Sequence, residues 1–419
     1  MSLPIGEAVL GSTLNHWAAA VSHATPLALA GAGAIALMLT GVVQSGMERH
    51  GRIGLVPLAV LASLALAIAS APLAQPVWAP LAAGLVAATL ARDREDALQA
   101  ECALKLLWVT GPAFALSWAG LSLLTLATGT TVAVEQWAVL QLGLDPSFLW
   151  STALPLELLA GLVLLGGAPF HFLVADVLQG VRPWLAASAV VALQVSGAAW
   201  LSRRLEGIAG FPAGRELVAS LLGIAAFAAF AAGAVTLLVQ RRPERRVGTL
   251  ASLNGGLVLA ALATAQPLPP AVLAAWAAHL ALAVAGAATV ARFLPTFAGP
   301  APGAPLFRLH PWSGIAGLYA LASLAGVPGT PGSMLWLASA RSLAMAGRTG
   351  LLLLVAAAWI AALTAAMRQW RQAFGVSAAP AATWEAGVTR SPVPLQARLA
   401  LWLSALGLVA LGALRLWRR

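Results

Sequence analysis

The chain has 419 residues, of which 60% are hydrophobic and only 9% are charged, and it carries a net charge of +10. This composition is typical of polytopic membrane proteins and excludes an ordinary soluble enzyme domain. The single cysteine, Cys102, excludes an internal disulfide and a cysteine-based metal site, and no basic tract indicates binding to nucleic acid.

Apolar runs long enough to cross a bilayer predict about twelve helices. In chain order the runs cover 27–44, 54–73, 76–92, 102–128, 148–178, 184–202, 217–240, 247–266, 270–293, 311–345, 349–373 and 396–416. When the loops alternate between two sides, most arginines gather on one side, which we expect to be cytoplasmic. Both termini are then expected outside the inner membrane of a bacterium.

The predicted organisation has two groups of five helices, at 54–202 and 217–373. An N-terminal segment with the first helix precedes them (1–53). A cytoplasmic loop (374–395) and a C-terminal helix (396–419) follow them.

Two predicted spans are interrupted by glycine and proline, which weaken or remove helical hydrogen bonds. The interrupting residues are Gly166, Gly167 and Pro169 in the first span, and Pro328, Gly329, Pro331 and Gly332 in the second. Each broken helix is the fourth of its group, and the groups start from opposite sides of the membrane. This pattern predicts an all-α membrane protein with two five-helix inverted repeats, each with a discontinuous helix. Two unrelated proline kinks are the alternative.

Short motifs occur in a characteristic order over roughly 95–375. They are Glu101-Cys-Ala-Leu-Lys105, Ala168-Pro-Phe-His171, Asp176-Val-Leu-Gln-Gly180, Arg246-Val-Gly-Thr-Leu-Ala-Ser252 and Ser323-Leu-Ala-Gly-Val-Pro328. With these motifs the chain resembles the antiporter-like membrane subunits of respiratory complex I and its relatives, most closely NADH–quinone oxidoreductase subunit N. Relative to the usual fourteen helices of that family, the chain appears shortened by two at the N-terminus.

The resemblance implies a membrane subunit of a redox-driven assembly, either a quinone-linked dehydrogenase or a membrane-bound hydrogenase. Its partners would be other membrane subunits and the lipid bilayer. This chain would bind no cofactor itself, and quinone, iron–sulfur clusters or flavin would lie in partner subunits. The alternative is a membrane subunit of an ion-coupled transporter, such as an inorganic-carbon uptake complex or an Mrp-type antiporter. Whether the chain belongs to an enzyme complex stays open.

The family carries protons on lysines and glutamates near the membrane centre, and most of these are absent here. Leu164, Gln194 and Trp336 stand where the resemblance implies lysines, and Pro80–Gly84 lacks the implied glutamate. The chain is therefore expected to act as a scaffold or to translocate protons at a reduced rate, because a path across ~30 Å of hydrocarbon needs several ionisable groups.

Lys105 is the only lysine among the 24 basic residues. A buried lysine can lose its proton, so Lys105 is a proton-path candidate. It can also form an ordinary ion pair with Glu101 one turn earlier and reach toward the interface.

Four further polar residues in the predicted spans are proton-path candidates: Glu157, His171, Gln194 and His279. Each has a structural alternative. Glu157 can be an acid paired near the outer interface, and the two histidines can be core residues that satisfy neighbouring groups. Asp176 is expected to be a helix-end acid near Arg182.

Overall fold

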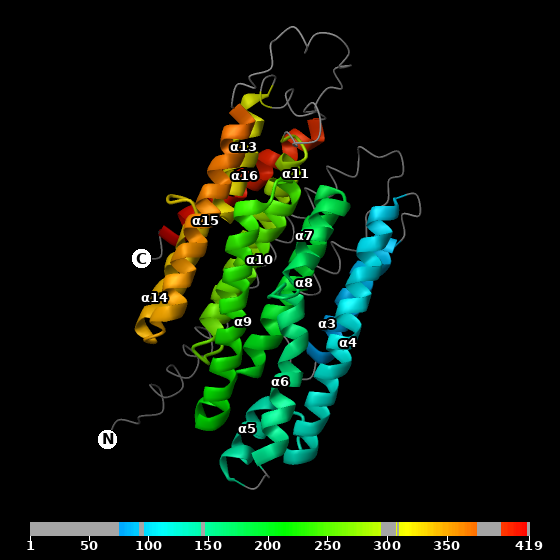
Figure 1. The fold of residues 1–419 in the computed structure, drawn as a ribbon, viewed down its shortest axis with the longest axis vertical. Coiled ribbons are helices and arrows are strands. Elements are labelled where there is room, and N and C mark those ends of the chain that lie inside the picture. Colours follow the sequence, from blue (N-terminus) through cyan, green and yellow to red (C-terminus); the bar gives the residue numbers. More distant parts are fainter. Residues whose placement is uncertain are drawn as a thin grey trace, which may run out of the picture.

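The computed structural model describes residues 75–91, 96–143, 147–294, 307, 310–374 and 395–416. These residues form α-helices, one short 3₁₀ turn and their connections, and no strand occurs within these ranges. The long helices run side by side along the long axis of the molecule (Figure 1).

The first half of the described chain runs from α3 to α8. Its elements are α3 (Gln75–Ala91), α4 (Ala97–Thr128), α5 (Ala133–Gln141), α6 (Ser147–Leu164), α7 (His171–Gly180) and α8 (Pro183–Arg204). Local chemistry sets the ends of α4. The Asp96 carboxylate accepts hydrogen bonds from the backbone N–H groups of Leu98 and Gln99, and the chain leaves the helix at Gly129 with a φ of 73°.

The second half follows the 3₁₀ turn η1 (Ile208–Gly210). Its helices are α9 (Pro212–Val239), α10 (Pro243–Leu262), α11 (Pro270–Ala291), α13 (Pro311–Leu324), α14 (Pro331–Met345), α15 (Thr349–Phe374) and α16 (Leu395–Leu416). Proline opens α8, α9, α10, α11, α13 and α14. At the first helical position proline removes only an N–H that has no partner within the helix, so it starts these helices at little cost.

The predicted spans agree with helices wherever the structure describes them, and six helices are long and apolar enough to cross a membrane. The predicted spans 27–44 and 54–73, and residues 375–394 of the predicted loop 374–395, lie outside the described residues. The sequence did not predict α5, a helix of only 9 residues.

Two helices form the centre of the bundle. The most apolar segment of α8 is 100% buried and that of α11 is 89% buried, whereas α4, α9 and α15 bury only 33% of theirs. The helix α8 packs against α3, α6 and α11, and α11 packs against α13 and α16. A chain whose outer helices expose apolar side chains fits a bilayer as its surroundings, and it is a multi-pass membrane protein.

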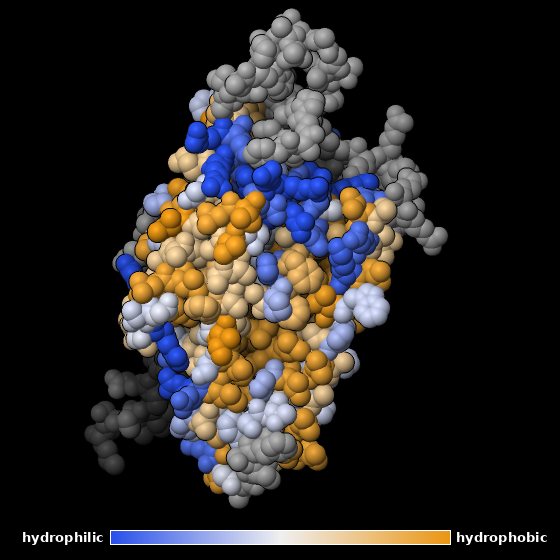
Figure 2. Space-filling view, viewed as in Figure 1, coloured by the Kyte–Doolittle hydropathy of each residue, from blue (hydrophilic) through white to orange (hydrophobic). Residues whose placement is uncertain are grey.

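Charged side chains concentrate toward one end of the molecule. Figure 2 shows hydrophilic residues in a band near the upper end, where α4 begins and α7 ends, with apolar residues below it. This separation is typical of a membrane protein whose charged loops lie on one side of the bilayer.

Two helical rods are interrupted near their middles. Regular helix stops at Leu164 and resumes at His171 in the first rod, and it stops at Leu324 and resumes at Pro331 in the second. Gly166 and Gly326 adopt φ values of 68° and 74° there, a left-handed conformation that side chains other than glycine rarely accept. The segments between α6 and α7 and between α13 and α14 are called the first break and the second break below.

The second break depends on close backbone contact at Gly332. A Cβ at this position would clash with the carbonyl oxygen of Ser323. We expect Gly332→Ala to destabilise the fold by about 1–3 kcal/mol, because backbone at a packed break cannot yield as a flexible side chain does. The thermal unfolding midpoint of the detergent-purified protein measures this effect.

Gly223→Ala in α9 is the matched control, since no atom lies within 4 Å of a Cβ there. In a helix interior that change is expected to be neutral or to stabilise the protein by up to about 1 kcal/mol. Equal midpoints for the two variants would contradict the close-contact argument.

Candidate functional site

Both breaks contact the same turn of α10. Gln194 of α8 donates through Nε2 to the carbonyl oxygens of Leu165 in the first break (2.9 Å) and Ala251 in α10 (3.1 Å). Three residues after Ala251, the Asn254 Nδ2 group donates to the carbonyl of Leu324 at the edge of the second break (2.9 Å). Gly255 lies so close to the first break that a Cβ would clash with the Leu165 carbonyl. We call Gln194, Asn254 and the carbonyls they bind the central amide bridge.

Hydroxyl, imidazole and indole groups complete the second break. Ser323 Oγ accepts a hydrogen bond from the backbone N–H of Gly332 (3.3 Å) and lies 3.0 Å from His279 Nε2. The indole N–H of Trp359 donates to the Gly326 carbonyl (2.9 Å). His279 is fully buried in α11, so its contact with Ser323 links the second break to the centre of the bundle.

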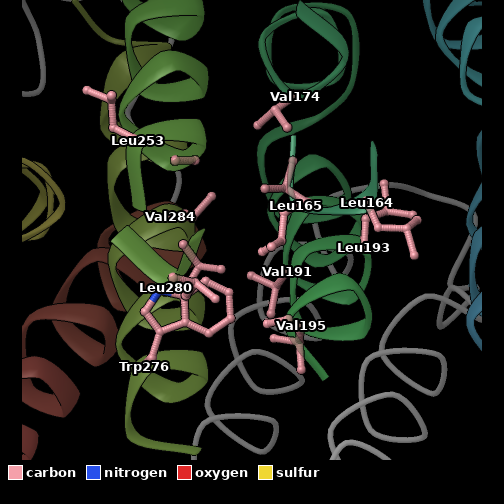
Figure 3. Close-up of a cluster of buried hydrophobic side chains, with 14 of the residues drawn as sticks. Leu164, Leu165, Val174, Val191, Leu193, Val195, Leu253, Trp276, Leu280 and Val284 are labelled. Atoms are coloured by element: carbon pink, nitrogen blue, oxygen red, sulfur yellow. The ribbon is translucent and has the colours of Figure 1, made fainter. Parts of the chain in front are cut away.

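The position of Leu164 is dry. Leu164 and Leu193 lie side by side, on the side away from Trp276, Leu280 and Val284 of α11 (Figure 3). They line a cavity of about 10 Å³, barely the space for one water molecule, and the other lining residues are apolar except Thr110. The Thr110 hydroxyl already donates to the Leu106 carbonyl, so the lining offers no set of polar partners for a water molecule.

Trp336 lies in α14 shortly after the second break, at another position where the resemblance implies a lysine. Its ring is fully buried and stacks on Trp359, with centroids 5.8 Å apart and planes 10° apart, while Phe230 lies 6.0 Å away. Three aromatic rings therefore occupy the space beside the second break, and they leave no charge there.

Glu157 forms a buried ion pair with Arg204. Glu157 Oε2 lies 2.7 Å from Arg204 Nε, and each side chain is only 5% exposed. Arg204 also donates to Gln136 Oε1 and stacks over the Trp137 ring at 4.5 Å. A carboxylate held by a fixed guanidinium is poorly suited to carry protons, so this geometry favours the structural alternative for Glu157.

Lys105 joins three helices at the charged end of the bundle. Its Nζ atom lies 2.6 Å from Glu101 of α4 and 3.2 Å from Asp176 of α7, and Asp176 binds Arg245 of α10 at 2.7 Å. We call these four residues the Lys105 network. The Lys105 side chain is 43% exposed, so it lies at the edge of the bundle and not at its centre.

His171 begins α7 directly after the first break. Ser252 of α10 donates to its backbone carbonyl at 3.4 Å, and its imidazole interacts with the backbone of Pro169. The structure thus places Gln194 and His171 at the first break and His279 at the second. Glu157 and the Lys105–Glu101 pair lie apart from them, at sites of their own.

Several partners were not predictable from the sequence. Asp176 lies between Lys105 and Arg245, contacts that the sequence did not predict, and Arg204 was not predicted to bind Glu157. The only signal for the second pair was one acid in an apolar helix, which requires some cation nearby. Within the described residues, no group of three histidine, cysteine or acidic residues could hold a metal ion.

Comparison with solved structures identifies the fold. The chain matches a chain of respiratory complex I from Thermus thermophilus with a TM-score of 0.71 and 23% identity, over 92% of this chain and 84% of that one. It matches a chain of the Mrp complex from Dietzia sp. with a TM-score of 0.72 and 15% identity, over 94% and 81%.

A chain of a membrane-bound sulfane sulfur reductase, an archaeal respiratory membrane complex, matches with a TM-score of 0.63 and 15% identity, over 95% of this chain and 94% of that one. No protein-family model and no curated protein matches the sequence. The chain has the fold of antiporter-like membrane subunits, as the motifs predicted, while the specific resemblance to subunit N stays a prediction.

The buried pair of Glu157 and Arg204 allows a double-mutant test. Glu157→Leu leaves Arg204 buried without its counter-charge, and we expect a loss of about 3–5 kcal/mol in the free energy of unfolding. Arg204→Met leaves the carboxylate and is expected to cost a similar amount, whereas the double variant regains most of the stability. Chemical unfolding of the purified protein measures all three variants. If the double variant lost as much free energy of unfolding as the two single variants together, Glu157 and Arg204 would not act mainly as a pair.

Proposed function

We propose that this chain is an antiporter-like membrane subunit of a complex I-related, redox-driven assembly in the cytoplasmic membrane of a bacterium. Within it the chain serves as a scaffold or translocates protons at a reduced rate. Its electron-transfer cofactors, whether quinone, iron–sulfur clusters or flavin, lie in partner subunits. The proposal rests on the fold and on the order of the sequence motifs.

The proposal of reduced proton translocation rests on the side chains found at the three positions where the resemblance implies lysines. One is a leucine beside a dry cavity, one is an amide whose N–H group binds two carbonyls, and one is a stacked indole. A proton relay needs groups that exchange protons or order water. None of these three side chains does so in the arrangement described.

The proposed architecture is two inverted five-helix repeats at 54–202 and 217–373, with both chain termini on the outer side of the membrane, opposite the cytoplasm. Two features support it. The breaks occur in corresponding helices of the two groups, and both touch the same turn of α10. The arginines of 241–246, 368 and 371 fall on the side assigned to the cytoplasm.

A second candidate is the membrane subunit of an ion-coupled transporter, which has a specific observation in its favour. The likeness to a chain of the Mrp complex is as strong as the likeness to a chain of complex I, with TM-scores of 0.72 and 0.71. Under this alternative the assembly would couple two ion or solute gradients without electron transfer.

Purification from native membranes separates the two candidates. The redox assembly predicts that an affinity tag on this chain recovers hydrophilic iron–sulfur subunits in stable ratio. Recovery with other membrane subunits or a carbonic anhydrase-like partner, and without iron–sulfur proteins, would favour the transporter. A lone, active monomer would overturn both.

The central amide bridge provides a test of translocation. Gln194→Ala removes the donor from the Leu165 and Ala251 carbonyls and is expected to lower stability by about 1–3 kcal/mol. Ion translocation per assembled complex is expected to stay unchanged, measured in proteoliposomes with the amount of complex quantified. His279→Ala is the parallel variant at the second break. Loss of translocation by either variant in an intact assembly would contradict the proposal.

Lys105 tests whether the Lys105 network acts in turnover. Arginine keeps the charge, but its planar guanidinium group cannot replace the compact ammonium group held between Glu101 and Asp176. We expect Lys105→Arg and Lys105→Ala to reduce turnover of the assembly more than its abundance. The exposed ion pairs themselves contribute only about 0.2–1 kcal/mol. Unchanged turnover in both variants would reduce Lys105 to a structural residue.

A further inference from the structure

One buried cation forms no ion pair with any acid in the described part of the chain. Arg246 of α10 is only 3% exposed, yet its guanidinium contacts neutral groups, the Gln240 carbonyl at 2.7 Å and Gln372 Oε1 at 3.1 Å. Within the described residues no carboxylate forms an ion pair with it. A buried charge of this kind is normally compensated by an anion.

Further arginines lie near Arg246, and Glu244 lies in the same first turn of α10. Arg368 of α15 is exposed, lies close enough for its charge to act unfavourably on Arg246, and donates to the Leu238 carbonyl at the end of α9 (2.8 Å). Arg371 lies one turn beyond it, and Arg242 precedes α10, both exposed. We call Arg242, Arg246, Arg368 and Arg371 the arginine cluster. It lies where α9 ends, α10 begins and α15 ends.

Apolar side chains lead up to the arginine cluster along the outside of the bundle. On α15, Leu353, Ile360, Met367 and Phe374 are all exposed and follow one another at seven-residue spacing, which places them on one stripe of the helix. An α-helix turns about 100° per residue. Around the axis of α15, Arg371 therefore lies about 40° from Met367 of the stripe, and Arg368 lies about 100° from it. The last turns of α9 expose Val235, Leu238 and Val239 on the other side of Arg368.

We propose that the arginine cluster binds the phosphate headgroup of an anionic phospholipid, whose acyl chains lie along the apolar stripe of α15. Three features fit this ligand together: a buried cation with no ion-pair partner among the described residues, exposed arginines that offer several planar donors, and an apolar surface that continues from them into the membrane. Basic clusters at the cytoplasmic ends of membrane helices recognise anionic headgroups in this way. Trp370, exposed beside Phe374 with ring centroids 5.7 Å apart, suits the interface at the same level.

The test measures lipid-dependent stability of the full-length protein in mild detergent. Phosphatidylglycerol is expected to raise the thermal unfolding midpoint in a saturable way, whereas phosphatidylcholine is not. The double variant Arg368→Gln/Arg371→Gln changes only exposed side chains, and its affinity for phosphatidylglycerol is expected to be roughly thirtyfold weaker. The control is Arg341→Gln/Arg348→Gln, two exposed arginines on α14 and in the turn just before α15, which is expected to bind as the unaltered protein does.

Each other outcome overturns the proposal. An equal response of the two double variants would indicate general charge attraction. Saturation by millimolar inorganic phosphate, with no added effect of the lipid, would indicate a site for free anions. An unaltered response of Arg368→Gln/Arg371→Gln would exclude the cluster. None of these outcomes bears on the co-purification test above, so the two proposals fail separately.

Discussion

The backbone of the two breaks is the constraint on which the rest of this structure depends. Inside a bilayer, every carbonyl that leaves helical geometry must find a donor within the protein. Gln194, Asn254 and Trp359 donate to such carbonyls, and Ser323 Oγ accepts a hydrogen bond from the backbone N–H of Gly332 at the second break. These buried polar side chains are consequently best understood as supports of the breaks.

This arrangement separates fold from activity. The overall fold is shared with chains of respiratory complex I, the Mrp complex and a sulfane sulfur reductase complex. Here the positions beside the breaks hold a leucine, an amide and an indole, which stabilise the breaks by packing and by neutral hydrogen bonds. Such side chains fill these buried positions without a charge, whereas an empty or unpaired polar position would destabilise the breaks.

Sequence patterns were sufficient for features that are local along the chain. Hydropathy located the described spans, and glycine and proline located the interruptions, because each signal lies within the segment that it shapes. Contacts between distant segments were not visible. Lys105 meets Asp176 across 71 residues and Asn254 meets Leu324 across 70, and one sequence does not record which groups will face each other. The helix α5 was missed because nine residues are too few for a spanning signal.

The ion pair between Glu157 and Arg204 has a consequence for biogenesis. An arginine costs about 2.5–3.5 kcal/mol at the centre of a membrane helix that inserts alone, and less at a helix end, where Arg204 lies. Arg204 ends α8, a helix fully enclosed by its neighbours, and its counter-charge is on α6, which enters first. Insertion is therefore easier when Glu157 and Arg204 pair before α6, α7 and α8 leave the translocon. Because Glu157 is synthesised before Arg204, its carboxylate is already at the lateral gate of the translocon when the guanidinium of Arg204 arrives.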